Sequence, residues 1–535
     1  MLGTGCLSNL QEKTMIIRNL YDTLANTAAA FPDKIGISDG KTRISYKELL
    51  QRTDFLSAYL KSVLQIKKGD CVGVLMLNCI EYILLIYAAA KIGAKVVLIN
   101  AKLHAKEIAF ILEDTKTEYL AIQADIWERV SHEIGKTQVK TLLLDANVMF
   151  EHMERYNVHC FSEGILYTEK TAEIRETDLD DPIAVLYTSG TSGTPKGAEI
   201  THRAVLETVY SYAKILNLNE NQSTLLAVPL FHVTGFSCIM AVFIYIGGYL
   251  RMLPSFHSDQ ALKILSEEHI RHFHAVPTIY QMLVNVMKKE YDLSSLESAV
   301  CGGGYIEDRL IKEFCSIAPN VSFHPAYGMT ETAGGGVLFP ESYLKSCKKG
   351  SAGKVMENCE IAIFDEQKKK LPAGEIGQIA FRGAMIISHY LNHKGEDNFV
   401  GEWLLSGDLG YLDNDNYIYV VGRIKSMVNR GGEKIYSRFV EREILSNPKV
   451  NQCMVFPVKD FLFGEVPGCV IVPNKGADVT EQEIRDYLKK RIQKTKIPVY
   501  IEFWDQLPNT ASGKVKVAYL SRLFTEKYYS EEGNH

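Results

Sequence analysis

Short apolar segments typical of buried strands alternate with helical segments from about Leu20 to Val420 of this chain. YKELLQRTDFLSAYLKSVL has apolar residues at helical spacing, and CVGVLML, KVVLIN, TLLLD, IAVLY and HFHAVP are typical of short strands. This alternation predicts an α/β fold, in which helices cover parallel sheets. At 535 residues the chain is too long for one hydrophobic core, so we expect at least two domains.

The pattern changes to shorter strands and turns after GEIGQIAFRG. DNDN, Asp413 to Asn416, stands between two apolar-aromatic runs and predicts a hairpin turn. The polar segment GRIKSMVNRGGEK then precedes a C-terminal segment with its own strand and helix pattern. We therefore expect an N-terminal domain of residues 1–424 and a small C-terminal domain of residues 425–535.

The net charge and the spacing of the cysteines argue against several classes of protein. A net charge of −5 argues against nucleic-acid binding, which favours a basic surface. Eleven cysteines without a CxxC pair argue against a disulfide framework or a zinc site. The N-terminus has no basic region followed by an apolar one, so we expect no signal peptide and a cytoplasmic protein.

Two apolar runs are interrupted in ways that argue against a transmembrane segment. In YILLIYAAAKIGAKVVLIN, two lysines break the run and Gly93 divides it into a helix and a following strand. In CIMAVFIYIGGYLRML, Gly247 and Gly248 follow too few apolar residues to cross a bilayer. We expect both runs to be buried in the core.

The most distinctive stretch is YTSGTSGTPKGAEITH, residues 187–202, which directly follows the apolar run IAVLY. It is not a P-loop, because Pro195 and Gly197 stand where that motif has glycine and Ser or Thr. Glycines allow backbone N–H groups to approach a ligand, and hydroxyls and a lysine add polar contacts, so the loop suits a polyphosphate. On composition alone a surface linker is equally compatible. The candidate ligand-binding residues are Thr188, Ser189, Gly190, Thr191, Ser192, Gly193 and Lys196.

The string YTSGTSGTPKG resembles the signature of the adenylate-forming superfamily, which contains acyl-CoA synthetases, luciferases and the adenylation domains of peptide synthetases. The resemblance runs from about Ile44 to Lys514, with the motifs in the family's order. It implies a large N-terminal domain of stacked α/β subdomains plus a distorted β-barrel, and a small, mobile α+β C-terminal domain. It also implies ATP, Mg²⁺ and, in many members, CoA.

AYGMTET, Ala326 to Thr332, is the second strong motif, and its alternative interpretation is a helix cap. Tyr327 offers a face for a purine, Thr330 offers a hydroxyl for the α-phosphate, and Glu331 is a hard oxygen ligand for Mg²⁺. The resemblance also assigns ligand-facing positions to Gly302, Gly303, Gly304, Gly328 and Met329, with the first three against the adenine. His232 in VPLFHVTG matches a position beside the acyl pocket that gates the thiol, although it alone would suit a core histidine.

Further motifs come from the C-terminal part of the chain. Asp408 in SGDLGYL can accept both hydrogens of a ribose diol, and Arg423 matches a residue that also holds the ribose. Lys425 matches the hinge of the family, although Ser426 stands where relatives often have Asp. Gly431 and Gly432 in NRGGEK would let a narrow pantetheine arm pass.

LPNTASGKVK supplies Lys514, which matches the family's catalytic lysine. The resemblance implies that Lys514 bridges the carboxylate and the α-phosphate while an acyl-adenylate forms, and that domain rotation then removes it. GGEK resembles stand-alone CoA ligases, so CoA is the expected acceptor. The alternatives are a separate acyl-carrier protein, luciferase-like oxidation, and a non-catalytic ATP-binding protein.

We expect the acid pocket to lie between His232, Gly302 to Gly304, and AGGGVLFP, residues 333–340. The glycines of these segments are expected to leave room, and Phe236 and Phe339 suggest an apolar lining. Because no lysine or arginine is evident there to pair with a second charge, we expect a monocarboxylic acid, fatty or aromatic.

Overall fold

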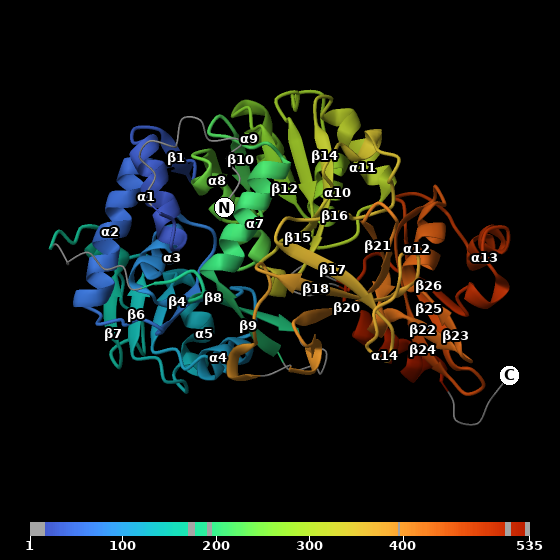
Figure 1. Cartoon of the computed structure of the whole chain (residues 1–535). Coiled ribbons are helices and arrows are strands. Elements are labelled where there is room, and N and C mark those ends of the chain that lie inside the picture. The colour runs from blue at the N-terminus through green and yellow to red at the C-terminus, as the bar shows by residue number, and fades with distance from the viewer. Residues whose placement is uncertain (1–15, 170–176, 190–194, 394–395, 509–514, 530–535) are drawn as a thin grey trace. The chain divides into compact units, whose positions relative to one another are not determined.

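The computed structural model describes residues 16–169, 177–189, 195–393, 396–508 and 515–529 (Figure 1). The chain forms two compact units, residues 1–360 with 381–404, and residues 361–380 with 405–535. The expected domains of residues 1–424 and 425–535 stay a prediction, because a division into compact units does not test a hinge at residue 425.

One sheet of the first unit has the strand order β7-β6-β5-β3-β4-β8-β9. Its strands are β3 (Cys71–Leu75), β4 (Lys95–Leu98), β5 (Tyr119–Ile122), β6 (Thr141–Leu144), β7 (Asn157–Cys160), β8 (Pro182–Ser189) and β9 (Pro195–Thr201). Neighbours pair in parallel except β8 and β9, which are antiparallel. The helices α4 (Ala105–Asp114) and α5 (Trp127–Ile134) contribute to the apolar core beside this sheet. The expected alternation of helices and parallel strands is confirmed here.

The second sheet of this unit is built around the parallel strands β14-β13-β12-β10-β11-β1. These are β1 (Ile35–Ser38), β10 (Ser223–Leu226), β11 (Tyr249–Met252), β12 (His272–Ala275), β13 (Ser298–Cys301) and β14 (Ser322–Gly328). The strand β2 (Arg43–Ser45) closes one edge antiparallel, and β15 (Gly336–Leu338) and β16 (Gly353–Val355) continue antiparallel beyond β14. Because these strands are parallel, the carboxyl ends of β12, β13 and β14 lie together at one edge of the sheet.

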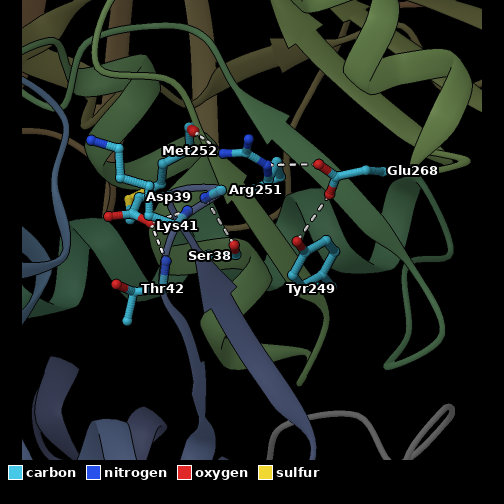
Figure 2. Close-up of polar contacts among 9 residues, drawn as sticks. Ser38, Asp39, Lys41, Thr42, Tyr249, Arg251, Met252 and Glu268 are labelled. Atoms are coloured by element: carbon cyan, nitrogen blue, oxygen red, sulfur yellow. Dashed lines mark hydrogen bonds and ion pairs between the residues drawn. The ribbon is translucent and has the colours of Figure 1, made fainter.

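The β1–β2 turn is held by polar contacts at the edge of the second sheet (Figure 2). Asp39 Oδ1 accepts hydrogen bonds from the backbone N–H groups of Lys41 and Thr42 at 2.8 and 2.7 Å. The buried Arg251 of β11 donates to Glu268 Oε1 at 2.8 Å and to the Met252 carbonyl at 2.6 Å. Pairing of this guanidinium offsets the cost of burying its charge.

The two sheets of the first unit are joined by a buried amide. Asn78, which follows β3, donates to the carbonyls of Val228 and Leu253, both at 3.1 Å. Its Oδ1 accepts from the Leu230 N–H at 2.8 Å. Three hydrogen bonds therefore tie the carboxyl end of β3 to segments that follow β10 and β11. The helix α7 (His202–Ile215) also contacts β9 of one sheet and β15 of the other.

Both apolar runs are core elements, as expected. The first forms the largely buried helix α3 (Ile80–Ile92), which ends at Gly93 with φ of +76°, before β4. The second forms the π-helix η2 (Thr234–Ala241) and the short helix α8 (Val242–Tyr245), followed by β11. Across the described ranges, no helix combines the length and apolarity that crossing a membrane requires.

The second unit carries its own antiparallel sheet, β23-β22-β25-β24, with β26 added parallel to β25. Its strands are β22 (Val428–Arg430), β23 (Glu433–Ile435), β24 (Val450–Asp460), β25 (Gly464–Pro473) and β26 (Tyr500–Phe503). Its helices are α12 (Ser437–Leu445), α13 (Glu481–Lys489) and α14 (Val517–Tyr528). In the same unit, residues 408–412 of β20 (Trp403–Leu412) pair with β21 (Tyr417–Arg423) in an antiparallel hairpin. Asp413 Oδ1 accepts from the Asp415 and Tyr417 N–H groups, so the predicted DNDN turn is confirmed.

Candidate active site

Glu331 is a buried carboxylate at the end of the second sheet of the first unit. β14 ends at Gly328, and Glu331 lies in the 3₁₀ helix η3 (Thr330–Thr332) that follows. The residue is 6% exposed. Glu331 Oε1 accepts hydrogen bonds from Thr188 Oγ1 at 3.2 Å and from the Tyr390 hydroxyl at 2.9 Å. Because Thr188 lies on β8, these contacts bring the AYGMTET motif to the strand that leads into the glycine-rich loop.

Tyr390 connects Glu331 with the lysine of that loop. The Lys196 ammonium lies 5.6 Å from the centroid of the Tyr390 ring, a cation–π distance. Tyr390 is 3% exposed, and its backbone forms a bridge to Ala198 of β9. Burial, together with the nearby Glu331 carboxylate, raises the pKa of the Tyr390 phenol, so the phenol stays protonated and donates to Glu331. One aromatic ring therefore orients both charged groups.

The segment around Tyr390 is fixed to the first sheet on one side and to the end of α4 on the other. His389 Nε2 lies 3.0 Å from Glu199 Oε2, and Lys95 Nζ lies 3.0 Å from Glu199 Oε1. Asn392 donates to Asp114 Oδ1 at 3.2 Å. These contacts hold residues 389–392 along β9, next to Lys196.

The surroundings of Glu331 fit a magnesium ion shared with phosphates. Within the described ranges both hydrogen bonds to this carboxylate end on Oε1, and none ends on Oε2. Mg²⁺ is commonly held by one or two carboxylates together with the phosphates of a substrate. Those same ranges contain no group of three His, Cys, Asp or Glu residues that could hold a metal without a substrate. Glu331, a single carboxylate with one oxygen that accepts no hydrogen bond from the described residues, therefore suits a magnesium ion that is also bound by the phosphates of a substrate.

The other predicted residues of the AYGMTET motif lie around this carboxylate. The Tyr327 ring lies 5.7 Å from the Phe381 ring, tilted by 39°, and Tyr327 is half-buried. Gly328, Met329 and Thr330 are also half-buried. The Met329 N–H donates to Thr332 Oγ1 at 3.0 Å, so the alternative interpretation of this motif as a helix cap is also correct.

Gly302, Gly303 and Gly304 follow β13, whose carboxyl end lies beside that of β14. The Gly302 N–H donates to the Ala275 carbonyl at 3.2 Å, which aligns the ends of β12 and β13. Gly303 and Gly304 are exposed. His232 lies before η2, is half-buried, and has its ring 5.0 Å from the ring of Phe231.

The expectation that the glycines of AGGGVLFP leave room for the acid is wrong for Gly334 and Gly335. A Cβ on Gly334 would lie 2.6 Å from Cys238 Sγ, and one on Gly335 would lie 2.7 Å from Thr208 Oγ1. These glycines therefore permit close packing of the chain. At Gly302, in contrast, the nearest atoms to such a Cβ are 3.6 Å away.

Two residues expected to hold a ribose are paired in the second unit. Asp408 of β20 lies opposite Arg423 of β21 in the strand register. Arg423 Nε lies 2.9 Å from Asp408 Oδ1, and the side chain of Asp408 is 10% exposed whereas that of Arg423 is 63% exposed. The exposed guanidinium therefore orients a buried carboxylate.

The remaining predicted residues of the second unit are exposed. Lys425 lies in the 3₁₀ helix η7 (Ile424–Ser426). Gly431 and Gly432 form the two-residue turn between β22 and β23, with φ of +57° and +93°. Two positive φ angles in succession explain why this hairpin contains two glycines.

Several predicted residues lie outside the described residues, namely Gly190, Thr191, Ser192, Gly193 and Lys514. β8 ends at Ser189, whose side chain is also outside the description.

Sequence reasoning missed Tyr390. It lies in the segment ISHYLNH, which has no glycine-rich or charged pattern. Its contacts with Glu331 and Ala198 join residues far apart in the chain, so no local signal could have identified it.

The chain matches two known family profiles. Residues 24–391 match the AMP-binding enzyme family, and residues 440–514 match the AMP-binding enzyme C-terminal domain. A long-chain-fatty-acid–CoA ligase, FadD13 of Mycobacterium tuberculosis, is 29% identical over 475 residues, covering 87% of this chain and 90% of that protein. A 2-succinylbenzoate–CoA ligase of Geobacillus kaustophilus is 31% identical over 504 residues, covering 94% and 97%.

Solved structures agree with these profiles. The anthranilate CoA ligase AuaEII in complex with anthranoyl-AMP has a TM-score of 0.86 at 24% identity, covering 95% of this chain and 98% of that chain. The o-succinylbenzoate CoA synthetase MenE of Bacillus subtilis, in complex with ATP and a magnesium ion, has a TM-score of 0.78 at 28% identity, covering 93% and 98%. The expected α/β adenylate-forming fold, with a large N-terminal and a small C-terminal domain, is confirmed. The chain belongs to the AMP-binding enzyme family, as one of its AMP-forming acid–CoA ligases.

Proposed function

We propose that this protein activates a monocarboxylic acid, fatty or aromatic, with ATP and transfers the acyl group to the thiol of CoA. The products are acyl-CoA, AMP and pyrophosphate. The observation that carries the proposal is the buried Glu331 carboxylate, held by Thr188 and Tyr390 beside the strand of the glycine-rich loop. The ATP and magnesium ion bound by MenE, a relative at 28% identity, support it.

In this proposal, Glu331 would hold a magnesium ion through the oxygen that has no hydrogen bond from the described residues. When bound, Mg²⁺ would neutralise charge on the departing β- and γ-phosphates. Tyr390 fixes the rotamer of Glu331, and Lys196, placed by the same ring, adds a positive charge for the phosphates. Thr188 holds the carboxylate from the side of β8.

The first half-reaction brings together two anions. A carboxylate oxygen of the acid attacks the α-phosphorus of ATP, the bond from that phosphorus to the bridging oxygen breaks, and pyrophosphate leaves. We assign to Lys514 the role of pairing with both the carboxylate and the α-phosphate, which offsets their repulsion as they meet. Asp408, oriented by Arg423, would accept the hydrogens of the ribose hydroxyls.

In the second half-reaction the thiol sulfur attacks the carbonyl carbon of the acyl-adenylate, AMP leaves, and the thiol proton is lost. We assign His232 to the entrance for the thiol, and Lys425 to the hinge about which the C-terminal domain rotates. The second unit presents Gly431 and Gly432 as an exposed hairpin turn, which suits a narrow thiol-bearing arm. CoA is favoured over an acyl-carrier protein because the curated relatives at 29% to 31% identity are CoA ligases.

A pyrophosphate-exchange assay tests this proposal. The protein is incubated with ATP, Mg²⁺, labelled pyrophosphate and a panel of fatty and aromatic acids, and label entering ATP is measured. Lys514→Ala should lower exchange by roughly a hundredfold or more, the scale of losing one preorganised charge in a transition state. Transfer from a synthetic acyl-adenylate to CoA should remain largely intact. Lys516→Ala, two residues away and exposed, is the matched control and should exchange normally.

The outcomes separate the alternatives. Acid-independent ATP binding without exchange would favour a non-catalytic ATP-binding protein and reject the proposal. Exchange followed by transfer to a phosphopantetheinylated carrier protein, but not to CoA, would replace CoA as the acceptor. The proposed activation of the acid with ATP would stand.

A further inference from the structure

A group of buried polar side chains lies on one face of the second sheet of the first unit, beneath α7 and η2. His272 and His274 are two residues apart on β12, so they point to the same face. The register places His274 beside Val300 and then His324. The Tyr212 ring of α7 stacks on His274, with centroids 5.7 Å apart and an angle of 24°.

Several polar atoms on these elements have no hydrogen-bond partner within the described ranges. They are Thr208 Oγ1 of α7, Thr224 Oγ1 of β10, Ser237 Oγ of η2 and Nδ1 of His274. The elements are neighbours, because α7 packs on η2, η2 packs on β10, and β10 pairs with β12. None of these four atoms has accessible surface, so they mark a polar interior beside β12 and are not themselves contacts for a ligand.

The imidazole of His274 reaches the carboxyl end of the strands. A Cβ on Gly302 would lie 3.6 Å from His274 Nε2, and Gly302 has no side chain to cover that nitrogen. The next residues, Gly303 and Gly304, are exposed. In open α/β sheets ligands bind at the carboxyl ends of the strands, which is where this nitrogen lies.

The protonation state of His274 limits what it can bind. Burial lowers the pKa of His274 to about 3, so the ring is neutral near pH 7. A neutral imidazole has one donor and one acceptor nitrogen. It therefore suits a hydroxyl or amino group, and it lacks the charge that a second carboxylate would need.

We propose that His274 hydrogen-bonds an uncharged hydroxyl or amino substituent on the body of the acid, so that the preferred substrate is a substituted monocarboxylic acid. The inference rests on the proposed function and adds a polar group to a pocket that was expected to have an apolar lining from Phe236 and Phe339. An unsubstituted acid would cover His274 Nε2, the nitrogen beside Gly302, without giving it a hydrogen bond, which is costly. His274 is thus a specificity-determining residue.

Matched pairs of acids test the inference. The pairs are benzoate with each of its ring-hydroxylated and ring-aminated isomers, and hexanoate with 6-hydroxyhexanoate. In acid-dependent pyrophosphate exchange, the best substituted acid should have a kcat/KM roughly 10- to 100-fold above that of its parent. His274→Phe keeps the ring but loses the hydrogen bond, and should bring that ratio close to one. His274→Gln should retain part of the preference.

His324→Phe is the control. It removes another buried imidazole of the same sheet row, whose Nδ1 already lies 2.9 Å from the Phe339 carbonyl oxygen. This control should leave the ratio unchanged. An equal fall in both variants would assign the effect to lost packing and overturn the proposal, as would a wild-type preference for the unsubstituted parents. The wild-type ratio provides this test even if His274→Phe does not fold. Absence of exchange with every acid would instead contradict the proposed function itself.

Discussion

At the scale of single residues, the orientation of Glu331 depends on few groups. Thr188 and Tyr390 both donate to Oε1, at 3.2 and 2.9 Å. Tyr390 is the more rigid donor, because its ring is buried, its backbone is bridged to Ala198, and Asn398 Nδ2 contacts its hydroxyl at 3.3 Å. We therefore infer that Tyr390 positions Glu331 without itself contacting a substrate.

Tyr390→Phe tests this role. The variant keeps the ring over Lys196 but loses one hydrogen bond to Glu331, worth about 1 kcal/mol, so half-maximal exchange should need roughly five- to tenfold more Mg²⁺. Binding of Mn²⁺ in the presence of ATP, followed by electron paramagnetic resonance, should weaken by a similar factor.

Tyr21→Phe is the matched control for Tyr390→Phe. Tyr21 is also buried and also donates to a carboxylate, Asp54 Oδ1, at 2.7 Å. It should lower stability without changing the metal requirement. Equal Mg²⁺ dependence in the wild-type protein and Tyr390→Phe would show that Tyr390 is merely structural.

Among single residues, the sequence predicted those that belong to a recognisable motif. Glu331 and Thr188 come from separate motifs, and the structure brings them within hydrogen-bond distance. Asp408 and Arg423 were expected to act on the same sugar, and they pair across a hairpin. Tyr390 and His274 could not be found this way, because their roles depend on tertiary neighbours with no fixed spacing.

At the scale of elements, the turn between β14 and β15 is defined by backbone packing. A Cβ on Gly328 would lie 2.0 Å from the Gly335 carbonyl oxygen and 3.1 Å from that of Gly334. Both contacts are with backbone atoms, which cannot move aside as a flexible side chain can. The glycine is therefore needed for the turn that carries Glu331.

Gly328→Ala should therefore destabilise the first unit by about 2–4 kcal/mol, as expected for a clash that forces the backbone to shift. Urea unfolding of the variant and the wild-type protein measures the difference. Gly304→Ala is the comparison, because its nearest neighbour would be Pro277 at 3.4 Å, and it should change stability by less than about 0.5 kcal/mol. Equal stability of Gly328→Ala and the wild-type protein would contradict the role assigned to Gly328.

Elements defined by local pattern were predicted better than those defined by packing. The helix–strand division at Gly93 and the DNDN turn follow from local signals, and both are present. The π-helix η2 and the close packing of Gly334 were not predicted. A run of glycines is compatible with either open space or close contact, and only the neighbouring side chains decide between them.

At the scale of the whole molecule, the fold class followed from the alternation of strands and helices together with the family resemblance. The sequence did not predict that residues 381–404 belong to the first unit. Their placement depends on long-range contacts such as Ala198 with Tyr390 and His389 with Glu199. Such contacts leave no periodic signal in the sequence.

Among the described residues of the first unit, four imidazoles are buried in their neutral form. Burial lowers the pKa of His202 and His274 to about 3, and it also lowers the pKa of His272 and His324. For His202 the nearby Asp181 opposes this shift and Lys68 adds to it. In the unfolded chain each imidazole would titrate near pH 6.5.

Stability of the first unit should therefore fall as the solution becomes more acidic. Below pH 6.5 the unfolded chain binds protons that the folded unit excludes, so each such histidine costs about 1.4 kcal/mol per pH unit until its folded pKa is reached. Carboxylates with lowered pKa values, such as Glu297 and Asp180, titrate in the unfolded chain only near pH 4 to 4.5, so the window from pH 6.5 to 5 reports mainly on the histidines.

Urea unfolding between pH 8 and pH 5 measures this slope, and His202→Asn isolates one contribution. Asn can still accept from the Leu20 N–H, as His202 Nδ1 does at 3.1 Å, but it does not titrate. The variant can be less stable at pH 8, yet its stability should fall by about 1.4 kcal/mol less per pH unit below pH 6 than that of the wild-type protein. Parallel curves for the two proteins would mean that His202 binds a proton equally well in the folded state, which its burial, with 1% of the residue exposed, argues against.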